Sequence, residues 1–112
     1  YDNLKTLQLQ GTIELPTIQR GCKHNAHMFY IKVSDMQTRS DLISHLKDCG
    51  ILAVFHYIPL HTSVAGEKSG RLHGEDTYTT SHSERLLRLP IYYGMTRNEQ
   101  KNVIQAILDF YS

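Results

Sequence analysis

The sequence contains no tryptophan and, among its 112 residues, only 2 cysteines and 3 prolines. Cys22 and Cys49 are too few for a disulfide framework and nothing at the amino end resembles a signal peptide, so we expect a cytoplasmic protein. Long apolar runs are also missing. The longest covers 51–60, is interrupted by His56 and Pro59, and is much shorter than the roughly 20 residues of a membrane span. We therefore expect no membrane segment.

An excess of charge of one sign is missing as well. The 12 Lys and Arg residues are interspersed with 11 Asp and Glu residues, which gives a formal net charge of +1. Such a sequence has no stripe that could neutralise a run of phosphates, the main source of nucleic-acid affinity, so we expect no nucleic-acid partner. The length of the chain corresponds to a single domain, 1–112, that can hold its own core.

The pattern of apolar residues predicts the element order α, β, α, β, loop, α, β, α. We expect strands over 26–33, 51–58 and 89–92, and the continuous apolarity of 51–58 predicts burial on both of its faces. Helices are expected before Gly11 and over 38–49, 81–89 and 96–111. This order predicts an α+β fold, with a small antiparallel or mixed sheet of about three strands covered by helices.

Capping signals and apolar stripes define the expected helices. Thr38 with Asp41, Ser81 with Glu84, and Thr96 with Glu99 each have the spacing of a capping box. In the expected helix over 38–49, Cys49 lies on the same apolar stripe as Leu42, Ile43 and Leu46. Six stripe residues are expected in the core: Leu42, Ile43, Leu46, Ile104, Ile107 and Leu108.

Segment 60–78 has no apolar period and is rich in glycine and serine, so we expect a long loop there. Long loops inside a compact domain commonly carry function. Its adjacent carboxylates, Glu75 and Asp76, point in different directions in any extended chain and are interpreted as solvated residues.

Two hypotheses use the 7 histidines. Cys22, His24 and His27 have the close spacing of metal ligands, and His56 or His61 could complete a tetrahedral set, as in a stand-alone metal-binding or small-ligand-binding module. The chain has no CxxC pair and no HExxH sequence to support this hypothesis, and hydrogen-bonded surface histidines are the simpler interpretation.

The second hypothesis is a ligand cleft at the end of strand 51–58. There His56, Tyr57 and His61 surround Pro59 and would form a stiff polar rim. The alternative for His56 is a satisfied core position on the face of Val54, which an alternation of period 2 permits.

The chain also resembles a known family. Its runs HNAHMFYIKV (24–33), AVFHYIPLH (53–61) and HGEDTYTTSHSERLLRLPIYY (73–93), with the capped last helix, are similar to the carboxy-terminal part of sugar-nucleotide aminotransferases of the DegT/DnrJ/StrS family. The resemblance implies a fold of the aspartate aminotransferase type (fold-type I), in which a small α+β domain folds over a large domain that binds pyridoxal 5′-phosphate. It implies amino transfer, typically from glutamate, to a 4-keto-6-deoxy sugar nucleotide for surface polysaccharide such as lipopolysaccharide.

Within that resemblance, this chain matches the small domain of a longer, homodimeric enzyme. The family's Schiff-base lysine lies on the large domain and none of the 6 lysines here matches its motif, so we expect no catalytic residue, no metal ligand and no activity in this chain alone. The residues that align with the cleft of the family are His27, His56, Tyr57, Pro59 and His61. Ala53 and Val54 stand where many relatives have an arginine, so glutamate recognition would need another residue.

Overall fold

Three short antiparallel strands form the sheet of this computed structural model, which describes residues 1–112. They are β1 (Phe29–Lys32), β2 (Val54–Phe55) and β3 (Leu86–Leu89), in the spatial order β1-β3-β2. Leu87 lies opposite Ile31 on β1 and opposite Phe55 on β2. The expected α+β fold with a small three-stranded sheet is confirmed.

The prediction of a helix through residues 86–89 is wrong, because these residues form the central strand. Leu87 and Leu89 are buried and alternate with half-buried Leu86 and Arg88. Leu and Arg are good helix formers, so local propensity favours a helix here. Pairing with strands on both sides outweighs that preference, since β-pairing depends mainly on packing against neighbours. The preceding helix is correspondingly short.

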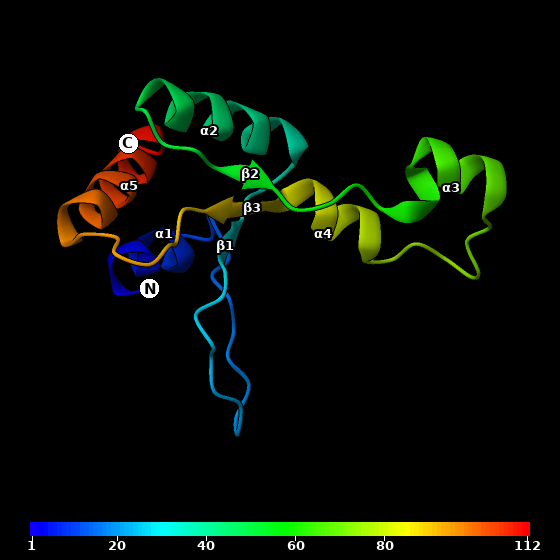
Figure 1. Cartoon of the computed structure of the whole chain (residues 1–112), viewed down its shortest axis with the longest axis horizontal. Helices are drawn as coiled ribbons and strands as arrows, with labels where there is room; N and C mark the ends of the chain where they lie inside the picture. Colours follow the sequence, from blue (N-terminus) through cyan, green and yellow to red (C-terminus); the bar gives the residue numbers. More distant parts are fainter.

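Helices and 3-10 turns surround the sheet. In chain order they are η1 (Asp2–Leu4), α1 (Lys5–Leu9), α2 (Met36–Asp48), η2 (Leu60–Thr62), α3 (Val64–Ser69), α4 (Thr79–Arg85) and α5 (Arg97–Phe110). Helices α2 and α5 pack against each other, and η1 packs against α5. Figure 1 shows α2, α5 and α1 around the left half of the sheet, with the two termini on that side. No helix is both long and apolar enough to cross a membrane.

The helix caps agree in part with the sequence. Thr96 and Glu99 form the expected capping box of α5. The capping box predicted for Thr38 and Asp41 is wrong: α2 starts earlier, and Asp35 caps it by accepting a hydrogen bond from the Thr38 N–H at 2.8 Å. Gly50, with a φ of 73°, takes the left-handed position after α2.

The core contains 14 buried apolar residues, which come from the helices, the sheet and the segments that connect them. Leu42, Leu46 and Ile107 are fully buried as expected, whereas Ile43, Ile104 and Leu108 pack against the core and are only partly buried. Cys49 was expected in the core but is exposed, because it is the C-cap residue that follows α2, beyond the last buried residue of the helix, Leu46.

Two expectations for residues 51–78 are also wrong. Strand β2 has only two paired residues, and Val54 and Phe55 are 42% and 45% exposed rather than covered on both faces. This edge strand has a neighbour on one side only. The expected loop over 60–78 contains η2 and α3, so part of it has regular structure.

Two arms extend from this body. One is the hairpin-like excursion of residues 14–32, which points downward in Figure 1; the other, residues 57–78 with α3, extends to the right. Glu14 and Lys32 close the base of the first arm through backbone hydrogen bonds of 2.8 and 2.9 Å. Their side chains form a salt bridge of 2.5 Å, and Arg85 donates to the same Glu14 carboxylate.

This cluster gives a testable pH dependence. Hydrogen bonds from Lys32 and then Arg85 lower the pKa of Glu14 below its ordinary value. A carboxylate with a lowered folded-state pKa contributes stability above its unfolded pKa, and that contribution is lost as pH falls through the folded value. Glu14 is 49% exposed, so Glu14→Gln should reduce the free energy of unfolding by less than about 1 kcal/mol at neutral pH. Urea unfolding should show this difference shrink as pH falls below the ordinary pKa of a glutamate, about 4.3, and a difference that does not shrink in acid would contradict the assignment.

Candidate functional site

The segment that follows β2 is fixed by contacts at its first residues. Ala53 is buried in the core. The guanidinium of Arg39, on α2, lies 5.3 Å from the ring centroid of Phe55, and its Nη1 donates to the carbonyl oxygen of Ser83 on α4 at 2.6 Å. Arg39 therefore joins α2, β2 and α4 at the place where the chain leaves the sheet.

His56 and Tyr57 come directly after β2, and their rings lie edge to face with centroids 4.0 Å apart. The Nδ1 atom of His56 is buried and has no hydrogen-bond partner. Burial, and then the charge of nearby Arg88, lowers the pKa of His56. The His56 ring is therefore neutral at physiological pH, with an unused polar atom that a ligand or another part of a longer protein could satisfy.

Tyr57 is 68% exposed, and its carbonyl oxygen accepts a hydrogen bond from the Ser83 hydroxyl. Pro59 then starts the turn η2, whose end is held by Thr62: the Thr62 N–H and hydroxyl both donate to the Pro59 carbonyl oxygen at 3.1 Å. These bonds fix the backbone between the sheet and His61.

His61 has the most complete side-chain environment of the predicted residues. Its Nε2 lies 2.8 Å from Oδ2 of Asp76 and 3.3 Å from Oγ1 of Thr80. The Thr80 hydroxyl also donates to Asp76, and the Thr80 N–H donates to the other carboxylate oxygen at 3.2 Å. These hydrogen bonds, first from the Thr80 hydroxyl and later from His61, lower the pKa of Asp76. The interpretation of Asp76 as a free solvated residue is therefore wrong, because its side chain is only 19% exposed.

The other predicted histidines do not join this group. His27 lies on the first arm, exposed, with its N–H bonded to Asn25 at 3.1 Å, and no hydrogen bond or aromatic contact connects it to His56, Tyr57 or His61. Cys22 and His24 lie on the same arm. No group of three or more His, Cys, Asp or Glu side chains is placed to hold a metal ion, so the structure does not support the hypothesis of a metal module.

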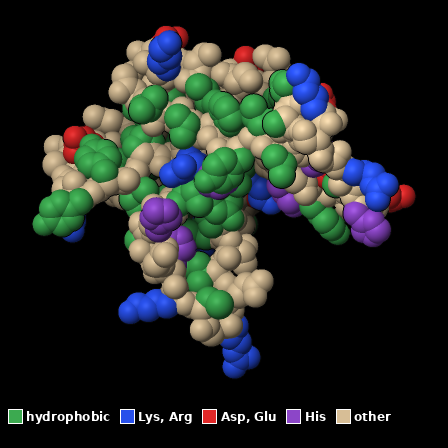
Figure 2. All heavy atoms as spheres, turned by 45° about the vertical axis from the view of Figure 1, so that its right-hand side comes forward, with side chains coloured by type: hydrophobic (Ala, Val, Ile, Leu, Met, Phe, Trp, Pro, Cys, Tyr) green, Lys and Arg blue, Asp and Glu red, His purple; other side chains and the backbone are tan.

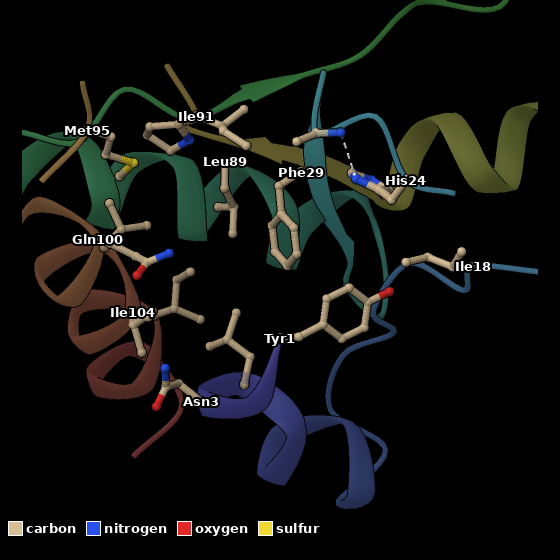
Figure 3. A pocket seen from close by; sticks show the side chains of 15 residues that line it. Tyr1, Asn3, Ile18, His24, Phe29, Leu89, Ile91, Met95, Gln100 and Ile104 are labelled. Carbon is tan, nitrogen blue, oxygen red and sulfur yellow. Dashed lines mark hydrogen bonds between the residues drawn. The ribbon is translucent and has the colours of Figure 1, made fainter. Parts of the chain in front are cut away.

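A cavity that the sequence did not predict lies between α5, η1 and the sheet. It has a volume of about 350 Å³ and is lined mainly by apolar side chains such as Phe29, Leu89 and Ile104. Figure 3 shows Tyr1 and Ile18 on one side, Met95 and Gln100 on the other, and the bond from the Ala26 N–H to His24. Its lining contains no Lys, Arg, Asp or Glu. A phosphorylated cofactor therefore does not fit this cavity, because nothing in it balances the phosphate charge.

The lysines do not fit a covalent cofactor site either. Lys32 is paired with Glu14, and the other 5 lysines are exposed. An amine that forms a Schiff base is activated by desolvation or by a neighbouring cation, and an exposed ammonium has neither. No lysine of this chain therefore has the environment of a Schiff-base residue.

A run of exposed apolar side chains accompanies the predicted cleft residues. Tyr57, Ile58, Leu60 and Val64 are between 64% and 77% exposed. Figure 2 shows apolar side chains gathered over the middle of one face of the molecule, with histidines at several points along their edge. Several exposed apolar side chains close together in the sequence favour an interaction site along this segment.

Sequence reasoning predicted His56, Tyr57, Pro59 and His61 as site residues, and did not predict the residues that contact this segment, Asp76, Thr80 and Arg39. Asp76 lies before α4 and Thr80 lies in its first turn, four positions later in the sequence. This spacing is not that of a capping box, so the sequence contains no signal for the pair. Nothing local in the sequence could place either residue against His61.

Comparison with known proteins agrees with this fold. A spore coat polysaccharide biosynthesis protein of Bacillus subtilis, SpsC, is 29% identical over 107 residues, which are 91% of this chain and 27% of the relative. A dTDP-3-amino-3,4,6-trideoxy-alpha-D-glucose transaminase of Micromonospora megalomicea is 28% identical over 95% of this chain and 28% of its own length. The chain thus spans a little over a quarter of the curated relatives it matches.

Among solved structures, one similar chain is the S. venezuelae protein DesV in complex with a ketimine intermediate. It matches with a TM-score of 0.82 and 27% identity, and the match covers 97% of this chain and 29% of the DesV chain. The B. subtilis protein NtdA, solved with bound cofactor PMP, has a TM-score of 0.73 and 26% identity, with 97% and 25% coverage. Residues 1–108 match the description of an aminotransferase family, DegT/DnrJ/EryC1/StrS. This match shows that the chain belongs to the DegT/DnrJ/EryC1/StrS aminotransferase family.

Proposed function

We propose that this chain is the carboxy-terminal domain of a pyridoxal-phosphate-dependent aminotransferase. The enzyme would transfer an amino group from glutamate to the keto carbon of a 4-keto-6-deoxy sugar nucleotide. The runs FHYIPLH, HGED and SERLLRLP resemble those of dTDP-4-amino-4,6-dideoxygalactose transaminase, which acts in the synthesis of lipopolysaccharide and enterobacterial common antigen. The proposal rests above all on the family match over residues 1–108.

In this proposal the cofactor binds to a large domain of the same chain, and a homodimer is the working form. The exposed apolar run after β2 would pack on that large domain. The chain's own contribution is a rim over the cleft, formed by His27, His56, Tyr57, Pro59 and His61. When bound, pyridoxal phosphate supplies the electron sink for amino transfer. The residues of this chain bind and orient the sugar nucleotide and keep water from it.

The arrangement around η2 supports this role. Pro59 and Thr62 fix the turn, and His61 is held by Asp76 and Thr80 rather than left free to rotate. Binding groups that are fixed before the ligand arrives lose less conformational entropy on binding. The buried, unpartnered Nδ1 of His56 gives the rim a second polar atom.

The direct test uses a longer protein that contains this chain and the proposed large domain. Purified with cofactor, it should be yellow and should transfer the amino group of glutamate to a dTDP-linked 4-keto-6-deoxyhexose, as followed by chromatography of the nucleotide products. The 112-residue chain alone should retain no cofactor on gel filtration and show no transfer. A colourless, inactive longer protein would overturn the proposal, and its mass in solution tests the homodimer.

Substitution of His61 tests the rim. In the longer enzyme His61→Ala should lower kcat/KM by about tenfold or more, because a held polar group at the cleft is lost. Its melting temperature should stay close to that of the parent. His82→Ala is the matched control, since His82 is an exposed histidine of α4. A large drop in melting temperature with unchanged kcat/KM would assign His61 a structural role instead.

A further inference from the structure

A second hollow lies on the arm beyond the cleft residues, between η2, α3 and the segment 70–73. It has a volume of about 440 Å³ and is lined by 9 residues, among them His61, Arg71 and His73. No Asp or Glu belongs to its lining. Arg71 and two histidines therefore line one concave surface, and the carboxylate that pairs with His61, Asp76, does not belong to its lining.

The walls of this hollow are fixed by close backbone packing. Gly66 of α3 lies so near η2 that a Cβ atom placed on it would be 1.6 Å from the Leu60 carbonyl oxygen. Ser63 links the two elements, because its hydroxyl donates to that oxygen at 2.7 Å and accepts from the Gly66 N–H at 3.0 Å. The hollow is consequently preformed in the free chain.

The His61 ring has a defined orientation at this wall. The ionised Asp76 carboxylate can only accept, and the Thr80 hydroxyl uses its single proton to donate to it. Nε2 of His61 must then carry the proton that faces Asp76. Nδ1 has no hydrogen-bond partner in the chain, so the ring is held through Nε2 alone.

Arg71 adds the permanent charge. It forms no salt bridge and no side-chain hydrogen bond in this structure. A guanidinium carries its charge at every accessible pH and presents planar donors that match phosphate oxygens. An unpaired arginine beside two histidines is therefore suited to a group with several anionic oxygens.

We propose that this hollow binds the diphosphate of the sugar nucleotide, through Arg71 and His73. This assignment rests on the proposed function for its choice of ligand. The other anionic reactant, glutamate, fits less well, because the walls hold no carboxylate that could accept from its ammonium group. The volume of the hollow lies within the range of small-molecule sites, roughly 300–1,000 Å³.

The binding test uses inorganic pyrophosphate as the probe. Titrated into the isotopically labelled 112-residue chain, it should cause saturable NMR shifts of the amides of 60–73 and of the His61 and His73 rings. Arg71→Gln should raise the dissociation constant for pyrophosphate about tenfold, which corresponds to about 1.4 kcal/mol. The matched control Arg97→Gln removes an exposed arginine of α5, outside the hollow, and should leave the constant unchanged. The site would be refuted if pyrophosphate caused no shifts, or if Arg71→Gln and Arg97→Gln weakened pyrophosphate binding equally. It would also be refuted if glutamate bound to the same residues as tightly as pyrophosphate does.

A kinetic test in the longer enzyme separates this inference from the proposed function. Arg71→Gln should raise the KM for the sugar nucleotide about tenfold and leave kcat and the KM for glutamate unchanged. An active enzyme in which Arg71→Gln behaves as the parent does would overturn the diphosphate site alone. If the longer protein fails to transaminate but pyrophosphate still binds at 60–73, the proposed function is wrong and the anion site stands.

Discussion

Leu87→Ala should lower the free energy of unfolding by about 2–5 kcal/mol. Leu87 is fully buried on the central strand and faces Ile31 on one neighbour and Phe55 on the other. Truncation removes its buried apolar surface and leaves a cavity that the paired strands on both sides cannot close. Domains of this size are stable by only about 5–15 kcal/mol, so this change removes a large part of the total. Urea unfolding followed by circular dichroism measures it.

The matched control is Leu52→Ala. Leu52 is 80% exposed, so its truncation should change the free energy of unfolding by less than about 0.5 kcal/mol. Equal effects of the two substitutions would contradict the placement of β3 at the centre of the sheet, and would favour the helix that local propensity predicts for residues 86–89.

Gly66→Ala should loosen the second arm, although alanine is the better helix former by about 1 kcal/mol. The added Cβ would lie 1.6 Å from the Leu60 carbonyl oxygen. This oxygen belongs to the backbone of η2, so it cannot move aside by a rotamer change as the end of a flexible side chain could. Overpacking of this kind typically costs about 1–3 kcal/mol. We expect α3 to separate from η2 and limited proteolysis within 60–78 to accelerate about tenfold, as the open population rises.

Lys68→Ala provides the comparison within the same helix, because Lys68 is exposed and forms no salt bridge. It should leave the rate of proteolysis unchanged or slow it slightly. Slower cleavage of Gly66→Ala than of the parent would show that helix propensity decides here and that the contact with η2 is not close. In the NMR titration with pyrophosphate, Gly66→Ala should also lose binding, because the hollow between η2 and α3 is no longer preformed.

Much of the fold follows from local signals. The capping box of α5, the left-handed Gly50 after α2 and the buried Leu42, Leu46 and Ile107 were all predictable. Each depends on residues within one or two helical turns of each other, so the sequence pattern contains the information. The fold class could be predicted for the same reason, because it requires only the order of elements.

The candidate site was predictable only along one segment of the chain. His56, Tyr57, Pro59 and His61 are contiguous, and a resemblance to a family motif identifies them together. Asp76 and Thr80 are 15 and 19 residues from His61 along the chain, and the hydrogen bonds that hold the ring exist only because α4 returns beside η2. His27, predicted for the same rim, shares no contact with the others in this chain.

The amino-acid sequence by itself determined the capping box of α5, the turn after α2, part of the core, the small α+β architecture and the resemblance to sugar aminotransferases, since all of these rest on the type and spacing of neighbouring residues. Only the tertiary structure decided that residues 86–89 pair as the central strand, that β2 stays exposed, and that His61 is held by Asp76 while Arg71 remains unpaired. These outcomes depend on contacts between residues far apart in the chain, whose free energies are comparable to local preferences and can reverse them.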